Sequence, residues 1–442
     1  MRDRRSSGSS AASDPRAEEQ ANVPGRLSDL PLLFWAMAVL TGVGAGLGAI
    51  LMMAVLRFVQ HLALNYHSGE YSKAAATHGP VRLVVVLAVG GLVTGVGLWL
   101  LHRSSKGTGG EPTEVVWTHH GSISVVRTLL SGALSEVTVA MGGSIGREAA
   151  PQRAGAAAGA LLGRHSRLTP EQRTLLIACG AGAGLAAVYN VPFAGALFTM
   201  EIYLGSLTLT MVVPALLTSG IATAVSWLTL PQHAVYSIPA LAGPNLAIMV
   251  FALVIGPLAG LASAGYIYLI GWASDHRPRG RLLLLEPLLV FTALGLIALS
   301  YPLLLGNGVD LAQYAFTGGA GILTLLALTA LKPIVTAACL RSGATGGLFT
   351  PTLSFGAAFG ALAGHIFLVL WPGPMSATYS LLGAVALLAA AIEAPLTGIA
   401  MLIELTHTVT LVAPMVLAAV SATLVSRRFN LRSIYSARLP PP

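Results

Sequence analysis

The sequence predicts an all-α protein that crosses a membrane many times and is built as two structural repeats with broken and re-entrant helices. Three observations predict this fold class. Of the 442 residues, 55% are hydrophobic and only 10% are Asp, Glu, Lys or Arg, against about 25% in soluble domains. Long stretches of the chain carry no charge at all. A related segment occurs twice, and each copy follows a Gly-rich break in an apolar run.

The uncharged apolar runs are the predicted membrane crossings. No Asp, Glu, Lys or Arg falls between Leu30 and Leu56, between Leu83 and Leu101, or between Thr174 and Met200. The runs 202–274 and 342–392 are much longer than the about 20 residues that one crossing needs, so each holds several crossings or re-entrant pieces. We expect roughly 12 to 16 apolar segments in all. A β-barrel is disfavoured, because the runs are long and do not alternate.

We expect one membrane domain between two short tails. Residues 1–28 are polar and predict a disordered cytoplasmic tail without a signal peptide. Residues 29–207 form the first repeat, residues 208–427 the second, and residues 428–442 a C-terminal segment. The net charge of +8 comes from basic residues in tails and loops, so it indicates topology and not nucleic acid binding. The positive-inside rule places both termini and these residues on the cytoplasmic face of the cell membrane: Arg2, Arg4, Arg5, Arg16, Arg26, Arg103, Lys106, Arg277, Arg279, Arg281, Arg427, Arg428 and Arg432.

The internal repeat is short but specific. Residues 185–201 read LAAVYNVPFAGALFTME and residues 388–404 read LAAAIEAPLTGIAMLIE, with the spacing Pro-x2-Gly-x5-Glu in both. Two related halves are typical of transporters whose site lies where broken helices from the halves meet. Because Glu201 and Glu404 recur in both copies, we predict that they are structural and bind backbone amides.

Each copy is preceded by a Gly-rich break that ends in proline. Residues 146–151 read GREAAP and residues 347–351 read GLFTP, and counting to the repeat proline places Glu148 and Phe349 in equivalent positions. A loop followed by Pro in the first turn is typical of a helix that starts inside a membrane. Helix N-termini offer unpaired N–H groups and about half a positive charge, so converging starts predict an anion site without Lys or Arg. Such a site holds an ion weakly enough to release it.

Glu148 is an acidic residue within the predicted anion site, and its presence there needs an explanation. An acid embedded among apolar segments is a functional candidate. Ionised, its carboxylate can occupy the amide-lined position of an anion; protonated, it is neutral and can move away. We therefore predict that Glu148 is both gate and proton acceptor. The alternative is an Arg147–Glu148 pair or a simple charge effect at a helix N-terminus.

A third break, residues 106–112, reads KGTGGEP and can add backbone amides and the Thr108 hydroxyl to the site.

Together these segments resemble the CLC family of chloride channels and chloride/proton antiporters, of the prokaryotic type without cytoplasmic CBS domains. GREAAP is similar to the family's GREGP, GLFTP fits its GxFxP, residues 180–201 resemble the helix pair that follows, and SIYSARL at 433–439 is similar to its pore-tyrosine segment. The resemblance spans residues 106–439. It implies that the two structural repeats are inverted relative to each other. It further implies a homodimer with a pore in each subunit, no cofactor, and transport of chloride and protons. It also implies that Glu148 is the gate, and that Thr108, Tyr435 and the backbone of Leu348 and Phe349 line the anion site.

Three departures from the family pattern bear on mechanism. GSGIP becomes GTGGEP, so the anion-site serine maps onto Thr108, which keeps a hydroxyl, or onto Gly109 if Pro112 is aligned. GREAAP carries one additional residue before its proline. The inner glutamate of many exchangers is replaced by Ile202, so the inner proton relay is absent. The leading interpretation is chloride/proton antiport, and the alternative is a passive voltage- or proton-gated chloride channel.

Four further residues in apolar stretches could have a function: Glu136, Ser144, Cys179 and Cys339. Glu136 is expected to make a structural hydrogen bond, with a substitute proton relay as the other interpretation. Ser144 lies in a G-x-S-x-G pattern, which marks a hydrolase only at a strand-to-helix turn, so an intramembrane hydrolase is disfavoured, as is a scaffold without transport. Cys179 and Cys339 are predicted core residues, and no metal or cofactor motif occurs. The expected partners are chloride and other small inorganic anions, protons and membrane lipid. A hydroxyl at Thr108 favours chloride.

Overall fold

The computed structural model describes residues 27, 30–104, 111–117, 123–239, 241, 243–318, 321–429 and 433–438. In these ranges all regular secondary structure is helical, and there is no extended strand. The first half contains α2 (Leu32–Leu64), α3 (Tyr71–Thr77), α4 (Pro80–Ser104), α5 (Pro112–Trp117), α6 (Val125–Ala140), α7 (Ala149–Arg164), α8 (Pro170–Tyr189), α9 (Pro192–Phe198) with its π-helical continuation η3 (Thr199–Leu204), and α10 (Leu209–Ser226).

The second half contains α11 (Leu246–Asp275), α12 (Leu282–Ala298), the 3-10 turn η4 (Pro302–Leu304), α13 (Val309–Phe316), α14 (Ile322–Arg341), α15 (Phe349–Leu370), α16 (Ala377–Ile392), α17 (Pro395–Thr406), α18 (Val412–Arg427) and the 3-10 turn η5 (Ser436–Arg438). The all-α multi-pass class predicted from the sequence is therefore confirmed.

Length and hydropathy identify the membrane crossings among the described helices. Six are long and apolar enough to span a bilayer: α2, α4, α10, α11, α14 and α15. Five shorter apolar helices accompany them, including α9 with η3, α16 and α17. Full-length spans are thus fewer than the 12 to 16 expected apolar segments, because several of those segments are short helices separated by loops. Large apolar side chains such as Leu51 and Leu289 are exposed on the outer faces of these helices, as in a protein that lipid surrounds.

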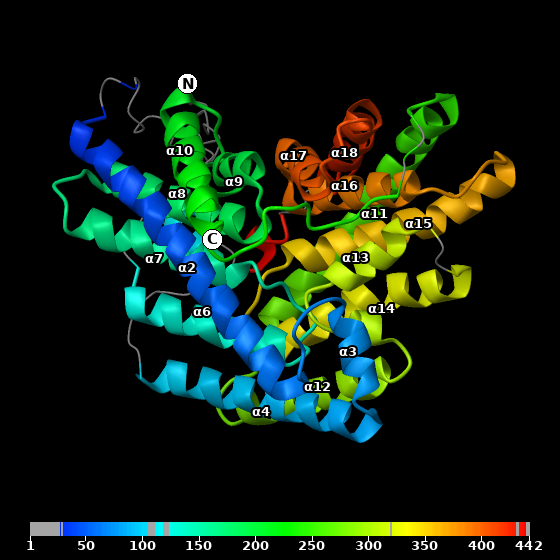
Figure 1. Cartoon of the computed structure of the whole chain (residues 1–442), viewed down its shortest axis with the longest axis horizontal. Helices are drawn as coiled ribbons and strands as arrows, with labels where there is room; N and C mark the ends of the chain where they lie inside the picture. The colour runs from blue at the N-terminus through cyan, green and yellow to red at the C-terminus, as the bar shows by residue number, and fades with distance from the viewer. Residues whose placement is uncertain are drawn as a thin grey trace, which may run out of the picture.

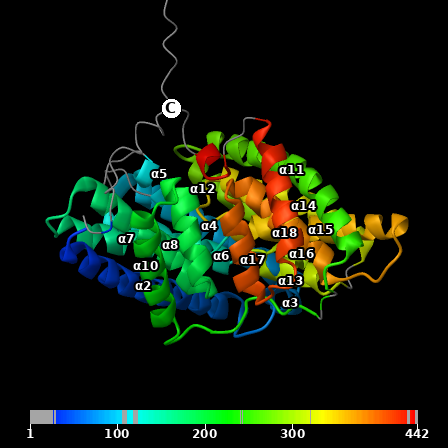
Figure 2. The ribbon, with the colours of Figure 1, turned by 90° about the horizontal axis from the view of Figure 1, so that it is seen from above.

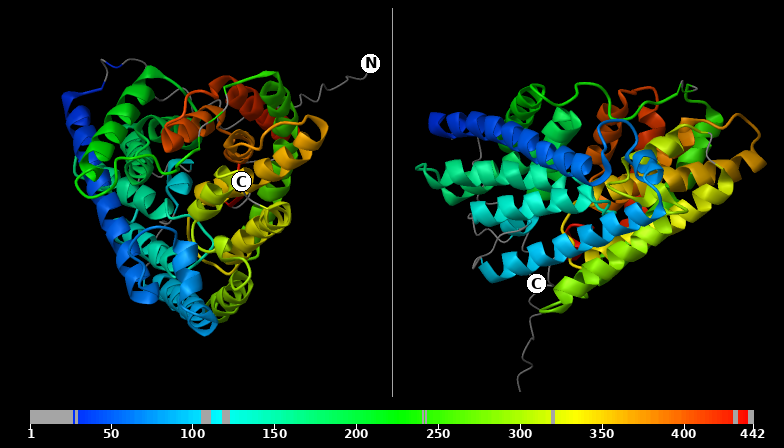
Figure 3. Two further views of the ribbon diagram at one scale, coloured as in Figure 1. Left: turned by 45° about the vertical axis from the view of Figure 1, so that its right-hand side comes forward. Right: turned by 60° about the horizontal axis from the view of Figure 1, so that its bottom comes forward.

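The two halves pack their helices in the same way. In the first half α2 contacts α8 and α10, α6 contacts α7, and α7 contacts α8. In the second half α11 contacts α16 and α18, α14 contacts α15, and α15 contacts α16. The halves lie side by side in Figures 1 and 2, with α2, α7, α8 and α10 on one side and α14, α15, α16 and α18 on the other. Two further views in Figure 3 show the same separation. The packing supports the predicted structural repeat, but α10 packs with α2, α8 and α9, so the first half extends through Ser226 and does not end at residue 207 as expected.

Glu201 and Glu404 join the halves by capping each other's helix. Glu201 accepts hydrogen bonds from the backbone N–H groups of Leu396 and Thr397 at the start of α17, at 3.3 and 2.6 Å. Glu404 accepts from the N–H groups of Phe193 and Ala194 at the start of α9, at 3.1 and 2.7 Å. The structural role predicted for both acids is confirmed.

The predicted core positions of the cysteines are also confirmed. Cys179 on α8 and Cys339 on α14 are both buried free thiols.

Candidate functional site: two helix starts around a buried glutamate

The two Gly-rich breaks meet at the interface of the halves. The Gly146 N–H donates to the Gly347 carbonyl at 2.7 Å, and the Gly347 N–H donates back to the Gly146 carbonyl at 2.8 Å. A side chain at either position would collide with the Glu148 carboxylate, so this close approach requires glycine. α7 starts directly after Glu148, and α15 starts at Phe349. The structure thus brings together the two helix starts that the sequence predicted to converge.

The carboxylate of Glu148 lies on the first turn of α15. Its Oε1 accepts a hydrogen bond from the Phe349 N–H at 2.7 Å, and its Oε2 accepts from the Thr350 hydroxyl at 3.1 Å and the Tyr189 hydroxyl at 3.2 Å. Only 1% of the residue is exposed. The Glu148 carboxyl group therefore lies at the helix start where the sequence analysis expects an anion.

Arg147 does not neutralise its neighbour. The described residues contain no ion pair between Arg147 and Glu148, and the Arg147 guanidinium lies 5.2 Å from the centroid of the Tyr189 ring. This arrangement is a cation–π contact. The alternative interpretation of Glu148 as half of an Arg147–Glu148 pair is wrong.

The structure shows where the first break, residues 146–151, accommodates its additional residue. Glu148 is the N-cap of α7 and Leu348 the N-cap of α15, and a proline is the third residue of each helix. Measured from the paired glycines, Glu148 comes two residues later and Leu348 one. Counted from the paired glycines, Glu148 and Phe349 both come two residues later, as predicted. Counted from the prolines, Glu148 corresponds to Leu348, because the additional residue lies between the paired glycine and the start of α7.

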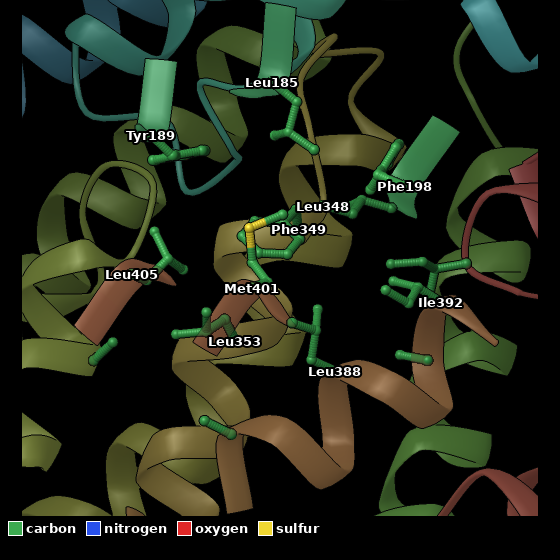
Figure 4. Close-up of a cluster of buried hydrophobic side chains, with 14 of the residues drawn as sticks. Leu185, Tyr189, Phe198, Leu348, Phe349, Leu353, Leu388, Ile392, Met401 and Leu405 are labelled. Atoms are coloured by element: carbon green, nitrogen blue, oxygen red, sulfur yellow. The ribbon is translucent and has the colours of Figure 1, made fainter. Parts of the chain in front are cut away.

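The C-terminal turn brings Tyr435 to the same region. The Ile434 N–H donates to the carbonyl of Ala391 on α16 at 2.9 Å, and the Tyr435 ring packs edge-on against Phe198 of α9 at 5.7 Å. Phe198, Leu348, Phe349 and Ile392 belong to one buried cluster, drawn in Figure 4. Tyr435 is 7% exposed, and its hydroxyl has no hydrogen-bond partner among the described residues.

The remaining predicted anion-site residues divide into two groups. Leu348 and Phe349 are buried at the start of α15, and the Phe349 N–H is engaged by Glu148. Thr108 and its alternative Gly109 lie outside the described residues.

Ile202 is buried in η3, and its carbonyl accepts a hydrogen bond from the Trp117 indole at 3.1 Å. The side chain at this position is apolar and carries no proton.

Glu136 differs from the expectation. Its residue is fully buried on α6, and neither carboxylate oxygen has a hydrogen-bond partner in the described part of the chain. The predicted structural hydrogen bond is therefore wrong. The charges of Arg147, Glu148 and Arg153 act on this acid.

Ser144 receives a hydrogen bond from the buried Lys332 ammonium at 2.9 Å. It lies in the loop between α6 and α7 and not on the strand-to-helix turn of a hydrolase. No cluster of three metal-ligating His, Cys, Asp or Glu side chains occurs in the described ranges.

Two side chains at the site and one ion cluster were not predicted from the sequence. Tyr189 and Thr350 contact Glu148, and their position inside the two motifs was the available signal: Tyr189 lies three residues before the repeat proline Pro192, and Thr350 directly precedes the break proline Pro351. The ion cluster is Glu111 with Arg153 of α7 and Arg438 of η5, whose Nη2 atoms both lie 2.8 Å from Glu111 Oε1.

The electrostatics of this cluster favour an ionised Glu111. Burial alone would raise the pKa of the Glu111 carboxyl, but the guanidinium groups of Arg438 and Arg153 outweigh burial and lower the pKa to about 2. Arg277, in the loop between α11 and α12, has its pKa lowered to about 10 by burial and by the like charge of Arg438. The cluster carries an excess of positive charge beside the Tyr435 segment.

Comparison with known proteins identifies relatives over most of the chain. Residues 87–427 match the family model described as "Voltage gated chloride channel". A putative ClcB-like chloride channel protein of Ralstonia nicotianae is 32% identical over 91% of this chain and 96% of its own length. The voltage-gated ClC-type chloride channel ClcB of Escherichia coli is 31% identical over 90% of this chain and 97% of its own.

Solved structures share the fold. A slow cyanobacterial Cl⁻/H⁺ antiporter superposes with a TM-score of 0.80 at 22% identity, covering 92% of this chain and 97% of that chain. A CLC-type fluoride/proton antiporter superposes with a TM-score of 0.73 at 22% identity, covering 92% and 98%. At this level of identity the likeness concerns the fold.

Proposed function

This chain belongs to the voltage gated chloride channel (CLC) family, and from that premise we propose that it exchanges chloride for protons across a membrane, with Glu148 as the gate and proton acceptor. Chloride transport is the coarser statement that the family membership itself supports, and transporters and channels of this family are not enzymes. The observation that carries the proposal is the Glu148 carboxylate bound to the Phe349 N–H at the start of α15.

The mechanism follows from competition for one position. The N-terminus of α15 presents unpaired amides and a partial positive charge, which bind a carboxylate and a halide in the same way. When Glu148 is ionised it occupies the position, and when it takes up a proton it loses the charge that holds it there. Chloride then replaces it, so each proton that neutralises Glu148 is linked to the entry of an anion.

The anion pathway continues from this position towards the C-terminal turn. We assign the backbone of Leu348 and Phe349 and the hydroxyl of Tyr435 as anion ligands, and we assign Thr108 the same role. Support comes from the unpartnered Tyr435 hydroxyl among the described residues, because a buried donor without a partner is costly unless a ligand accepts its hydrogen.

A passive chloride channel is the second candidate, and Ile202 favours it. An apolar side chain where many exchangers carry an inner glutamate removes a fixed proton relay between Glu148 and the inner face. Among the relatives, the ClcB proteins are named channels, whereas the superposable structures are named antiporters. The two candidates differ in whether protons are coupled to chloride.

Reconstituted vesicles distinguish exchange from passive conduction. We expect an imposed chloride gradient to drive protons uphill in vesicles that contain the wild-type protein. Glu148→Gln mimics the protonated gate, so it should keep chloride flux and abolish proton flux. The control is Glu70→Gln, because Glu70 is part of an exposed ion pair with Lys73 and should leave both fluxes unchanged. Chloride flux without uphill proton movement in the wild type would establish the channel, and unchanged proton flux in Glu148→Gln would remove the assigned role.

We further propose a homodimer with one pore per subunit and both termini in the cytoplasm. Molar mass in detergent by light scattering tests the first statement. Protease access to tags on the two tails in inverted vesicles tests the second.

A further inference from the structure

We propose that a cavity between the end of α4 and the start of α12 binds the phosphate group of an anionic phospholipid. The cavity has a volume of about 350 Å³, within the range of about 300 to 1,000 Å³ that is typical of ligand sites. From α4 it is lined by Trp99, His102 and Arg103. From the loop before α12 it is lined by Arg279 and Gly280. None of these residues belongs to the proposed anion pathway, so the inference goes beyond the proposed function.

The packing of α4 against α12 explains where the cavity lies. The two helices are in contact along much of their length and lie side by side in Figure 1. A Cβ atom at Gly91 would come within 2.4 Å of the Pro287 carbonyl oxygen, and one at Gly95 within 2.6 Å of the Leu283 carbonyl oxygen. The glycines therefore let the two backbones touch. One turn later the same side of α4 carries the large side chain of Trp99, and the cavity lies at this point.

The charges around the cavity are suited to a phosphate. The Arg103 guanidinium lies 4.9 Å from the centroid of the Trp99 ring, a cation–π contact that positions it at the cavity. Neither Arg103 nor Arg279 forms an ion pair within the described ranges, and no Asp or Glu from those ranges lines the cavity. The N-cap of α12, Arg281, makes no side-chain capping bond, so the partial positive charge of this helix start adds to that of the arginines. Guanidinium groups match the geometry of phosphate oxygens.

The position of the cavity along α4 favours a lipid phosphate over free phosphate. α4 is one of the six described helices that are long and apolar enough to span a bilayer, and Trp99 and Arg103 lie near its end. Aromatic and basic residues at the ends of a span lie at the level of the lipid headgroups. Leu100 and Leu285, in the helical turns that flank the cavity, are exposed and can contact acyl chains. A basic cavity between helices at this depth attracts anionic lipids.

Native mass spectrometry of the full chain in detergent, titrated with phosphatidylglycerol, tests the proposal. Arg103→Gln and Arg279→Gln should each raise the Kd for this lipid about fivefold, because each removes one positive charge beside the phosphate. The double variant should bind more weakly than either single variant. Arg103→Lys keeps the charge and should recover most of the affinity. Phosphatidylcholine, which has no net charge, should bind more weakly than phosphatidylglycerol, and its Kd should not depend on the two arginines.

A matched control and a competing anion complete the experiment. Arg428→Gln removes an exposed arginine at the end of α18 that does not line the cavity, so it should leave the Kd unchanged. Each variant is checked for a monodisperse elution profile. Equal Kd values for phosphatidylglycerol in wild type and the double variant would overturn the proposal. Displacement of the lipid by an equal concentration of inorganic phosphate would overturn the assignment to lipid. Both results concern lipid binding alone and would leave the proposed function intact.

Discussion

Glu111 shows how a single charged residue can hold the turn that carries Tyr435 in place. One of its oxygens binds Arg153, four residues into α7, and Arg438, three residues after Tyr435. The two arginine side chains are 1% and 5% exposed, and both contact the same carboxylate oxygen at 2.8 Å. Breaking such a pair from one side leaves a buried charge without its partner ion, which costs more than the pair contributes. Glu111 therefore fixes the distance between the helix that begins after Glu148 and the turn that carries Tyr435.

We expect Glu111→Gln to destabilise the protein by on the order of 3 kcal/mol at neutral pH. The pKa of Glu111 is lowered from an ordinary value near 4.5 to about 2, so its contribution is complete above pH 4.5 and is lost as the pH falls towards 2. Thermal unfolding in detergent should show a gap between wild type and variant at pH 7 that narrows between pH 4.5 and pH 2. A gap independent of pH over this range would show that charge is not the cause.

The replacement of Gly347 tests the close contact between the two Gly-rich breaks. Gly347→Ala places a methyl group on the Glu148 carboxylate, which must then leave the Phe349 amide. We expect the variant to conduct chloride, while the ratio of proton flux to chloride flux falls by at least about tenfold. This is the effect of losing one hydrogen bond to a charged group. Simultaneous recording of chloride and proton flux measures the ratio. Gly265→Ala, at a glycine on α11 with open space around it, is the control.

At the scale of elements, the short helices α9 and α17 are completed by each other. Their N-cap residues are Val191 and Ala394, which have no side chain that accepts a hydrogen bond. The first N–H groups of each helix are satisfied by the glutamate near the end of the other, Glu404 for α9 and Glu201 for α17. A carboxylate is also favoured there by the helix dipole. The repeat in the sequence thus encodes a reciprocal contact between the halves.

Glu201→Ala and Glu404→Ala should each lower stability by about 2 kcal/mol, because each leaves two backbone donors without acceptors. Glutamine at either position retains an acceptor oxygen and should cost less. Thermal unfolding in detergent measures both, with Glu70→Ala as an exposed control. Equal stability of the alanine variants and wild type would show that water satisfies these helix starts equally well.

Much of the fold could be predicted from the sequence, because membrane crossings and the repeat depend on residues that are close together in the chain. Uncharged runs define the spans, and Pro-x2-Gly-x5-Glu identified Glu201 and Glu404 before their partners were known. Pairing between distant residues could not be predicted in this way. Glu111 and Arg438 are 327 positions apart, and the contact of Thr350 with Glu148 depends on how two halves dock.

The whole molecule is a pair of similar halves with an extensive interface. α4 packs against α12 and α9 against α17, and the glutamate caps and the paired glycines add polar contacts. The connection between the halves passes through the exposed residues Pro231, Gln232 and His233 after α10. We therefore expect the peptide connection at this point to contribute little to the association of the two halves.

Cutting the chain within this connection should leave an assembled protein. We expect co-expressed fragments 1–232 and 233–442 to purify together and to transport chloride in vesicles, while neither fragment alone does so. Co-purification by a tag on one fragment provides the measurement. Recovery of the tagged fragment without its complement would contradict the prediction.

The two backbone hydrogen bonds between Gly146 and Gly347 limit which parts of the molecule can move relative to each other. Because each glycine uses its donor and its acceptor on the other, the loops before α7 and α15 are coupled rigidly, and any rocking of one half against the other would have to break both bonds. The reciprocal glutamate caps resist the same displacement. Under the proposed function, we therefore expect the gate to open by rotation of the Glu148 side chain while the backbone around it stays in place.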